Sequence, residues 1–378
     1  MKIQKDYEIC MPEKTYIGPG SFHKLQKDFA ERKIGRCLIV TDKFLASSEV
    51  GKTVTNMLDS CQVKYSIYDE VKANPLIAQV AEGVKAFYKE GCDCIVSLGG
   101  GSAHDCAKGM KATIINDQES HYKKVLFIAI NTTAGTGSEV TKFSIITDEK
   151  THYKLTLIDD SLMPDIAVND PKFMVGMPLS LTSTTGMDAL THAIESYTSV
   201  GANPFTKANA LYAIKMIFES LEQACKDGND MGKRTEMAYA QYLAGLAFSN
   251  SGLGMVHAMA HQLGGLYNLP HGLCNAVLLP YVMEYNMDVC SKEYCEISVF
   301  AQTCQASTGE KFGATRLIRA IQTLNEKIKI PKTLKGFNVD VKDAEKLAEM
   351  ALKDASLACN AKQPTKQQLI DIYLKILK

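Results

Sequence analysis

The sequence changes character near residue 180, and this change most constrains the fold. Before it, short β-branched and apolar runs alternate with longer stretches that have helical periodicity. After it, such runs disappear and long amphipathic helices dominate, for example over 205–224 and 236–248. At 378 residues the chain is longer than one hydrophobic core usually supports. We therefore expect an α/β domain over residues 1–180 and an all-α domain over 181–378.

The first half predicts a parallel sheet. Strand, helix and strand in succession favour parallel pairing with right-handed crossovers. The segment 75–89 is the clearest helix between two strands, with Pro75 near its first turn. The expected strands are 36–41, 63–68, 94–98, 125–130, 154–158 and 166–168.

Composition excludes several classes of protein. Hydrophobic residues make up 46% and charged residues 22%, which is typical of a soluble globular chain. The formal net charge is zero, so nothing indicates a nucleic-acid or anionic-membrane partner. No apolar run is long enough to span a membrane, and the first residues lack the apolar core of a signal peptide. Twelve scattered cysteines without a CxxC pair then favour reduced thiols, and we expect a cytoplasmic protein.

Three polar segments follow predicted strands and indicate a nucleotide site. Gly99, Gly100, Gly101 and Ser102 stand between a strand and a helix start, where backbone N–H groups can approach a phosphate. The hydroxyl-rich loop 131–141, which contains Thr132, Thr133, Thr136 and Thr141, follows the next strand. Asp42 ends an earlier one, where a carboxylate can bind ribose hydroxyls. Each segment alone is more typical of a turn, but together they predict one ligand crevice.

The second half contains a group of metal-capable side chains. Asp188 and His192 are spaced i,i+4, as are His257 and His261, so each pair shares a helix face; His271 follows in a Pro-His-Gly loop. A single histidine on an apolar helix is usually a core or capping residue. Two such pairs and a loop histidine in a chain with eight histidines instead indicate a metal site. One carboxylate and three imidazoles suit iron(II) or zinc, and the absence of a glutamate rules out the HExxH pattern of metalloproteases.

Four segments, over 99–105, 132–140, 186–195 and 257–265, resemble the iron-dependent (group III) alcohol dehydrogenases in order and spacing. The resemblance covers nearly the whole chain. It implies an N-terminal dinucleotide-binding α/β domain with a parallel sheet, an all-α C-terminal metal-binding domain, and an active-site cleft between them. Two positions depart from the family pattern, because Asn131 and His104 stand where proline is frequent.

The resemblance also implies roles for individual residues. It assigns Asp188, His192, His257 and His271 as metal ligands, and His261 as a histidine near the metal that is usually not a ligand. His261 is then the best-placed group for a proton relay, although a purely structural role is equally consistent with its position. On the cofactor side the resemblance implies contacts from Gly100, Gly101, Ser102, Thr132, Thr133, Thr141 and Lys154.

The expected activity is the interconversion of a small primary alcohol and its aldehyde by hydride transfer with NAD(H), the metal acting as a Lewis acid. Asp42 favours NAD over NADP, and Phe143, Phe248 and Leu253 are candidates for an apolar substrate channel. We also expect a homo-oligomer, as is common in the family. The alternatives are a glycerol-dehydrogenase-like or dehydroquinate-synthase-like enzyme of the same architecture, or a metal- or nucleotide-binding protein without turnover.

Overall fold

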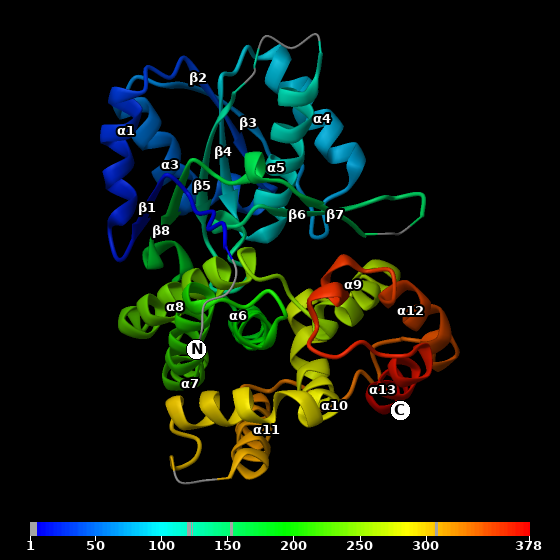
Figure 1. Ribbon diagram of the computed structural model, residues 1–378. Helices are drawn as coiled ribbons and strands as arrows, with labels where there is room; N and C mark the ends of the chain where they lie inside the picture. The colour runs from blue at the N-terminus through cyan, green and yellow to red at the C-terminus, as the bar shows by residue number, and fades with distance from the viewer. Residues whose placement is uncertain (1–5, 119–121, 123, 152–153, 307–308) are drawn as a thin grey trace.

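A six-stranded parallel sheet forms the N-terminal part of the chain (Figure 1). The computed structural model describes residues 6–118, 122, 124–151, 154–306 and 309–378. The strand order is β1-β8-β5-β4-β2-β3, and every neighbouring pair is parallel, as the sequence predicts. The strands are β1 (Lys14–Ile17), β2 (Arg36–Val40), β3 (Lys64–Tyr68), β4 (Cys94–Gly99), β5 (Leu126–Asn131) and β8 (Ile166–Asn169).

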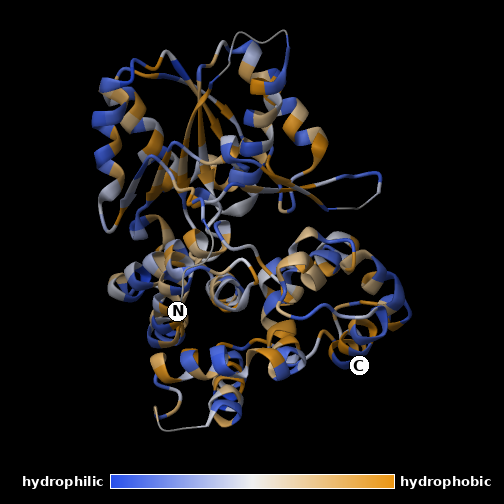
Figure 2. Ribbon diagram, in the orientation of Figure 1, coloured by the Kyte–Doolittle hydropathy of each residue, from blue (hydrophilic) through white to orange (hydrophobic). Residues whose placement is uncertain are grey.

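Helices cover both faces of this sheet because successive strand residues point to opposite sides. Leu38 of β2 packs with α4 (Ile77–Lys89) and α5 (Gly101–Asn116), whereas its neighbour Ile39 packs with α1 (Leu25–Glu31) and α3 (Glu49–Ser60). The short α2 (Lys43–Ser47) follows β2. Figure 2 shows the strands as the most hydrophobic part of this layer, enclosed by helices with hydrophilic outer faces.

Two elements of this half differ from the expectation. The predicted strand 154–158 forms as β7 (Lys154–Ile158), but it pairs antiparallel with β6 (Phe143–Thr147) in a separate ribbon. The helix expected from Pro75 begins two residues later, at Ile77, because Leu76 is extended and the Pro75 carbonyl accepts the N–H of Thr147.

From Leu179 onward the described residues form helices and no strands. The predicted segments 205–224 and 236–248 lie within α7 and α8. The helices are α6 (Leu179–Thr198), α7 (Pro204–Lys226), α8 (Met231–Ser249), α9 (Met255–Tyr267), α10 (His271–Phe300), α11 (Glu310–Lys327), α12 (Ala344–Ala351) and α13 (Lys366–Leu377). The placing of a domain boundary near residue 180 stays a prediction. No helix of the described segments is long and apolar enough to cross a membrane.

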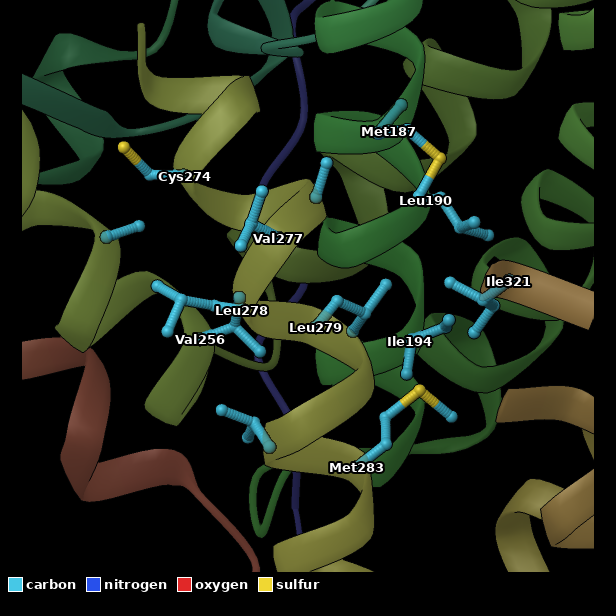
Figure 3. Close-up of a cluster of buried hydrophobic side chains, with 14 of the residues drawn as sticks. Met187, Leu190, Ile194, Val256, Cys274, Val277, Leu278, Leu279, Met283 and Ile321 are labelled. Atoms are coloured by element: carbon cyan, nitrogen blue, oxygen red, sulfur yellow. The ribbon is translucent and has the colours of Figure 1, made fainter. Parts of the chain in front are cut away.

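A single apolar core holds these helices together and passes through α6 and α10. Figure 3 shows Leu190 and Ile194 of α6 beside Leu279 and Met283 of α10, with Ile321 of α11 closing one side. All five side chains are buried. This packing fixes α6 against α10, and both helices carry predicted metal ligands.

Proline 280 interrupts the hydrogen bonding of α10 without breaking the helix. Proline has no N–H, so the carbonyl of Ala276, four residues earlier, lacks its usual donor. The side-chain amide of Asn325, from α11, donates to that carbonyl at 2.9 Å. The helix therefore continues as one element from His271 to Phe300.

Candidate active site

The four predicted metal ligands come together from three helices. Asp188 and His192 lie on α6, His257 on α9 and His271 at the start of α10. The Nε2 atoms of His192, His257 and His271 lie 3.8, 3.7 and 3.5 Å from Oδ1 of Asp188. One donor atom from each of the four residues lies within 4.8 Å of every other.

Local sequence explains how the helices bring these atoms so close. The i,i+4 spacing puts Asp188 and His192 on one face of α6. The start of α10 can approach α6 only because residue 272 is glycine. A Cβ there would lie 2.2 Å from the carbonyl oxygen of Thr184. Gly272 therefore allows His271 to reach the carboxylate of Asp188.

The donor set fits a divalent transition metal. In a tetrahedral site with metal–ligand bonds of ~2.1 Å, donor atoms are separated by roughly 3.4 Å. The three separations from Asp188 are slightly longer than that and too long for hydrogen bonds. Burial lowers the pKa of His192 to about 4 and the pKa of His271 well below its usual value. Both rings are therefore neutral near pH 7, as a metal-binding imidazole must be.

Two further side chains support the ligands, and sequence reasoning did not identify them. Glu195 lies with Oε2 2.6 Å from Nδ1 of His257, and its carboxylate also accepts the backbone N–H groups of Gly254 and Val256. Asn275 donates from Nδ2 to Oδ1 of Asp188 at 2.6 Å. Glu195 is seven residues after Asp188, which places it on the same face of α6, and this spacing was the available signal.

His261 lies beside the cluster but outside the ligand set. Its ring stacks on His271 with centroids 5.3 Å apart, and its Nδ1 lies 2.9 Å from Oδ2 of Asp354. Burial raises the pKa of Asp354, but His261 and the N–H of Ser356 outweigh this and hold it below its usual value. Asp354 is therefore ionised near pH 7 and accepts a proton-bearing Nδ1, which leaves Nε2 of His261 as the remaining polar atom of the ring.

A cavity that is partly open to solvent connects this cluster to the sheet domain. Its wall contains the four ligands and His261 from one side and the loops of the sheet domain from the other. The apolar part of the wall includes Phe143, Phe248 and Leu253, the three residues expected to line a channel. Phe248 stacks on His192 with centroids 4.3 Å apart, so the apolar wall directly adjoins the ligands.

The predicted nucleotide loops meet at the carboxyl edge of the sheet. The chain runs from β2 outward to β3 and then returns to β4 on the other side of β2, which makes the β2–β4 gap a topological switch point. Ligands of such sheets bind at this position. Asp42 follows β2 and the glycine loop follows β4. The backbone N–H of Thr132 donates to the carbonyl of Gly99 at 3.0 Å and joins the glycine loop to the threonine loop.

Only some of the predicted cofactor residues line the cavity. Gly101, Ser102, Thr136, Thr141 and Lys154 line it, whereas Asp42, Gly99, Gly100, Thr132 and Thr133 lie outside its wall. A Cβ at position 100 would lie 2.8 Å from the side chain of Thr133, and one at position 101 would lie 2.9 Å from Thr136. The two glycines therefore allow the glycine loop to pack against the threonine loop.

Asp42 has a structural role that sequence reasoning did not predict. Its side chain caps α2 by accepting the N–H of Leu45 at 2.9 Å. Lys43, the cation next to Asp42 in the sequence, pairs with Glu70 at 2.8 Å.

Lys154 is buried at the cavity wall, and burial lowers its pKa. Its Nζ donates to Oδ1 of Asn74 at 2.9 Å, and Nδ2 of Asn74 donates to Oδ1 of Asn268 at 2.7 Å. This chain of hydrogen bonds joins the β6–β7 ribbon, the loop after β3 and the end of α9.

Comparison with known proteins agrees with this geometry. A model of the iron-containing alcohol dehydrogenases matches residues 12–171, and a model of the C-terminal part of that family matches residues 182–377. Alcohol dehydrogenase 4 of Saccharomyces cerevisiae is 43% identical over 374 residues, which cover 97% of each protein. The 1,3-propanediol dehydrogenase of Citrobacter freundii is 38% identical over 97% of this chain and 98% of its own length.

Solved structures give the same result. A 1,3-propanediol oxidoreductase superposes with a TM-score of 0.94 at 37% identity, over 99% of this chain and 100% of that one. An alcohol dehydrogenase from Oenococcus oeni has the same TM-score and identity, over 98% of this chain and 100% of that one. The chain therefore belongs to the iron-containing alcohol dehydrogenase family of metal-dependent alcohol and aldehyde oxidoreductases.

Proposed function

We propose that this chain interconverts a short primary alcohol and its aldehyde, with NAD(H) as the hydride carrier and iron(II) held by Asp188, His192, His257 and His271. The observation that carries the proposal is one cavity whose wall contains all four of these side chains together with the loop residues Gly101 and Ser102. A cofactor that lies along these loops reaches the same space as a substrate oxygen at the cluster. Relatives named for such activities support it, among them an NAD-dependent methanol dehydrogenase from Bacillus methanolicus that is 38% identical.

The metal at the cluster would supply Lewis-acid polarisation of the carbon–oxygen bond. The chain supplies position and proton movement. Glu195 fixes the orientation of His257, and Phe248 holds His192 by stacking. His261, oriented by Asp354, is the group in the cavity wall that we propose passes a proton between substrate and solvent.

The cavity wall favours a small, largely apolar substrate. Phe143, Phe248 and Leu253 cover the side next to the ligands, and Lys154 is the only lysine or arginine in the wall formed by the described residues. Because Lys154 lies on the side of the cofactor loops, we propose that it contacts the cofactor and that substrates carry no anionic group.

We further propose a cytoplasmic homo-oligomer. Seven of the twelve cysteines are buried, which suits a reducing compartment. Light scattering on the purified protein measures the oligomeric state.

The test of the proposed function is an NADH absorbance assay. The iron-loaded protein should oxidise NADH in the presence of short aldehydes and reduce NAD with the corresponding alcohols. Turnover only with glycerol, or only with a phosphorylated sugar acid without net NADH consumption, would support the glycerol-dehydrogenase-like or the synthase-like alternative instead. Tight NADH and iron binding without turnover of any of these compounds would indicate a binding protein.

A further inference from the structure

One face of α8 holds the loop that lines the cofactor side of the cavity. Gln241, Gly245 and Ser249 follow one another at intervals of four residues, so they share a helix face. Oε1 of Gln241 accepts the N–H of Gly137 at 3.0 Å, and Oγ of Ser249 accepts the N–H of Lys142 at 3.3 Å. The segment 137–142 is therefore attached to α8 at both of its ends.

Between these two contacts the backbones of the loop and α8 touch. Gly137 has a φ of +61°, and a Cβ on it would lie 2.7 Å from Cα of Gly245. A Cβ on Gly245 would lie 2.8 Å from Cγ2 of Val140. A side chain at either position would force the loop away from the helix.

Gln241 also belongs to a fully buried polar cluster, which we call the Gln241 network: Asn131, Glu139, Asn169 and Gln241. Nε2 of Gln241 donates to Oε1 of Glu139 at 2.7 Å and to Oδ1 of Asn169 at 2.9 Å. Nδ2 of Asn169 donates to Oε1 of Glu139 at 2.8 Å, and Nδ2 of Asn131 donates to Oδ1 of Asn169 at 2.8 Å. All four side chains are 0% exposed.

The network reaches the threonine loop as well. Oδ1 of Asn131 accepts the N–H of Thr133 at 3.0 Å, and its Nδ2 donates to the carbonyl of Thr133 at 2.7 Å. Asn131 is one of the two positions where the sequence departs from the family pattern. A hydrogen-bonded turn thus constrains the threonine loop at this position.

Polar contacts at this boundary have a consequence that apolar contacts would lack. Burying four polar side chains costs free energy unless each is hydrogen-bonded. Their hydrogen bonds require definite distances and directions, so they allow only one position of the sheet domain relative to α8. Apolar surfaces in contact would tolerate small displacements.

The same helix positions the metal side of the cavity. Phe248, seven residues after Gln241, stacks on His192 and lines the cavity, and Ser138 and Thr141 of the attached loop line the same cavity. The helix α8 therefore lies between the cofactor loop and a metal ligand and contacts both.

We propose that Gln241 is a positioning residue for hydride transfer, which acts by holding the cofactor loop in register with the metal cluster through α8. The inference rests on the proposed function, because it presumes that NADH lies along this loop. The Gln241 network would then align C4 of the nicotinamide with the substrate carbon that exchanges the hydride, in addition to stabilising the contact between the sheet domain and α8.

Two variants test it in the iron-loaded protein. Gln241→Leu keeps the size of the side chain and removes its hydrogen bonds, whereas Gly245→Ala adds the Cβ that displaces the loop. Asn325→Leu is the matched control, because it also removes a buried side-chain amide from the helical part of the chain. Asn325 lies on α11, donates to the carbonyl of Ala276 in α10 and is not part of the cavity wall. NADH affinity, turnover, bound iron, thermal stability and the isotope effect with NADH deuterated at C4 are measured for all three.

Both test variants should keep their iron and bind NADH roughly tenfold more weakly, and turnover should fall by roughly 10- to 100-fold because the reacting atoms are misaligned. Their deuterium isotope effect should rise because hydride transfer becomes slower than product release. Asn325→Leu should lose thermal stability only. If Gln241→Leu and Gly245→Ala match Asn325→Leu in kinetics and NADH affinity, the network is merely structural and the proposal is wrong.

If none of the aldehydes tested supports NADH oxidation by the parent protein, the proposed function fails independently of this inference. The NADH titration then decides the inference alone: weaker binding in both variants supports loop positioning, and unchanged binding overturns it.

Discussion

The carboxylate of Glu195 lies 2.6 Å from Nδ1 of His257 and turns the opposite nitrogen of that ring toward Asp188. The partners of Glu195 are buried, so this orientation does not depend on solvent. A carboxylate on the far nitrogen of a ligating histidine fixes its tautomer and raises its basicity. We therefore expect Glu195 to control metal affinity without contacting the metal.

Glu195→Gln should weaken iron binding by roughly 10- to 100-fold, because a neutral amide accepts less strongly from Nδ1 than a carboxylate. Competition with a chromogenic chelator measures the change. Glu222→Gln is the control, since Glu222 pairs with Lys226 and Lys327 on the helical surface, and it should leave affinity unaltered. Equal chelator curves for Glu195→Gln and the parent would contradict the assigned role.

His257→Ala and His271→Ala should each lose most of the bound iron and the activity while retaining the helical circular dichroism spectrum. Each removes one of only four donors in the cluster. His23→Ala, an exposed histidine of the sheet domain, is the control. Metal analysis that finds full occupancy in both ligand variants would mean that the four residues do not form the site.

Turnover should fall by roughly ten- to a thousandfold in His261→Gln, with little change in iron content, if His261 passes the proton. Asp354→Asn should also lower turnover, because an amide holds Nδ1 of His261, and with it the orientation of the ring, less firmly than a carboxylate does. Unaltered turnover and pH dependence in His261→Gln would leave this residue a structural role only.

Cofactor preference should depend on the charge of Asp42. Lys43 pairs with Glu70 and therefore does not offset the charge of Asp42. The carboxylate of Asp42 should repel the 2′-phosphate of NADP, so NAD should be preferred by at least about tenfold in kcat/KM. Asp42→Gly should narrow this preference. Asp42→Asn separates charge from capping, because it keeps an oxygen for the N–H of Leu45. Equal kcat/KM with NADH and NADPH in the parent would show that Asp42 does not approach the ribose.

The sequence predicted the elements whose signal is local. Five of the six expected strands lie in the parallel sheet, because each contains a run of β-branched, aromatic or other apolar residues, and the pair Asp188 and His192 follows from helical spacing. The edge strand β1 was missed, since Lys14–Ile17 is only half buried and mixes polar with apolar residues.

Features built from distant segments carried no local signal. Asp354 lies 93 residues from its partner His261, and Gln241 lies 102 residues from Glu139. The pairing of β7 with β6 was equally hidden, because an apolar run predicts a strand but not which sheet it joins.

The central claim is that hydride transfer requires a metal at the Asp188 cluster. The direct measurement is NADH oxidation by one active aldehyde before chelation, after removal of metal, and after addition of iron(II) under anaerobic conditions. The account predicts loss of activity on chelation, with NADH binding retained, and recovery at one iron per chain, whereas His271→Ala should not recover at that stoichiometry. Full activity of metal-free protein would contradict it.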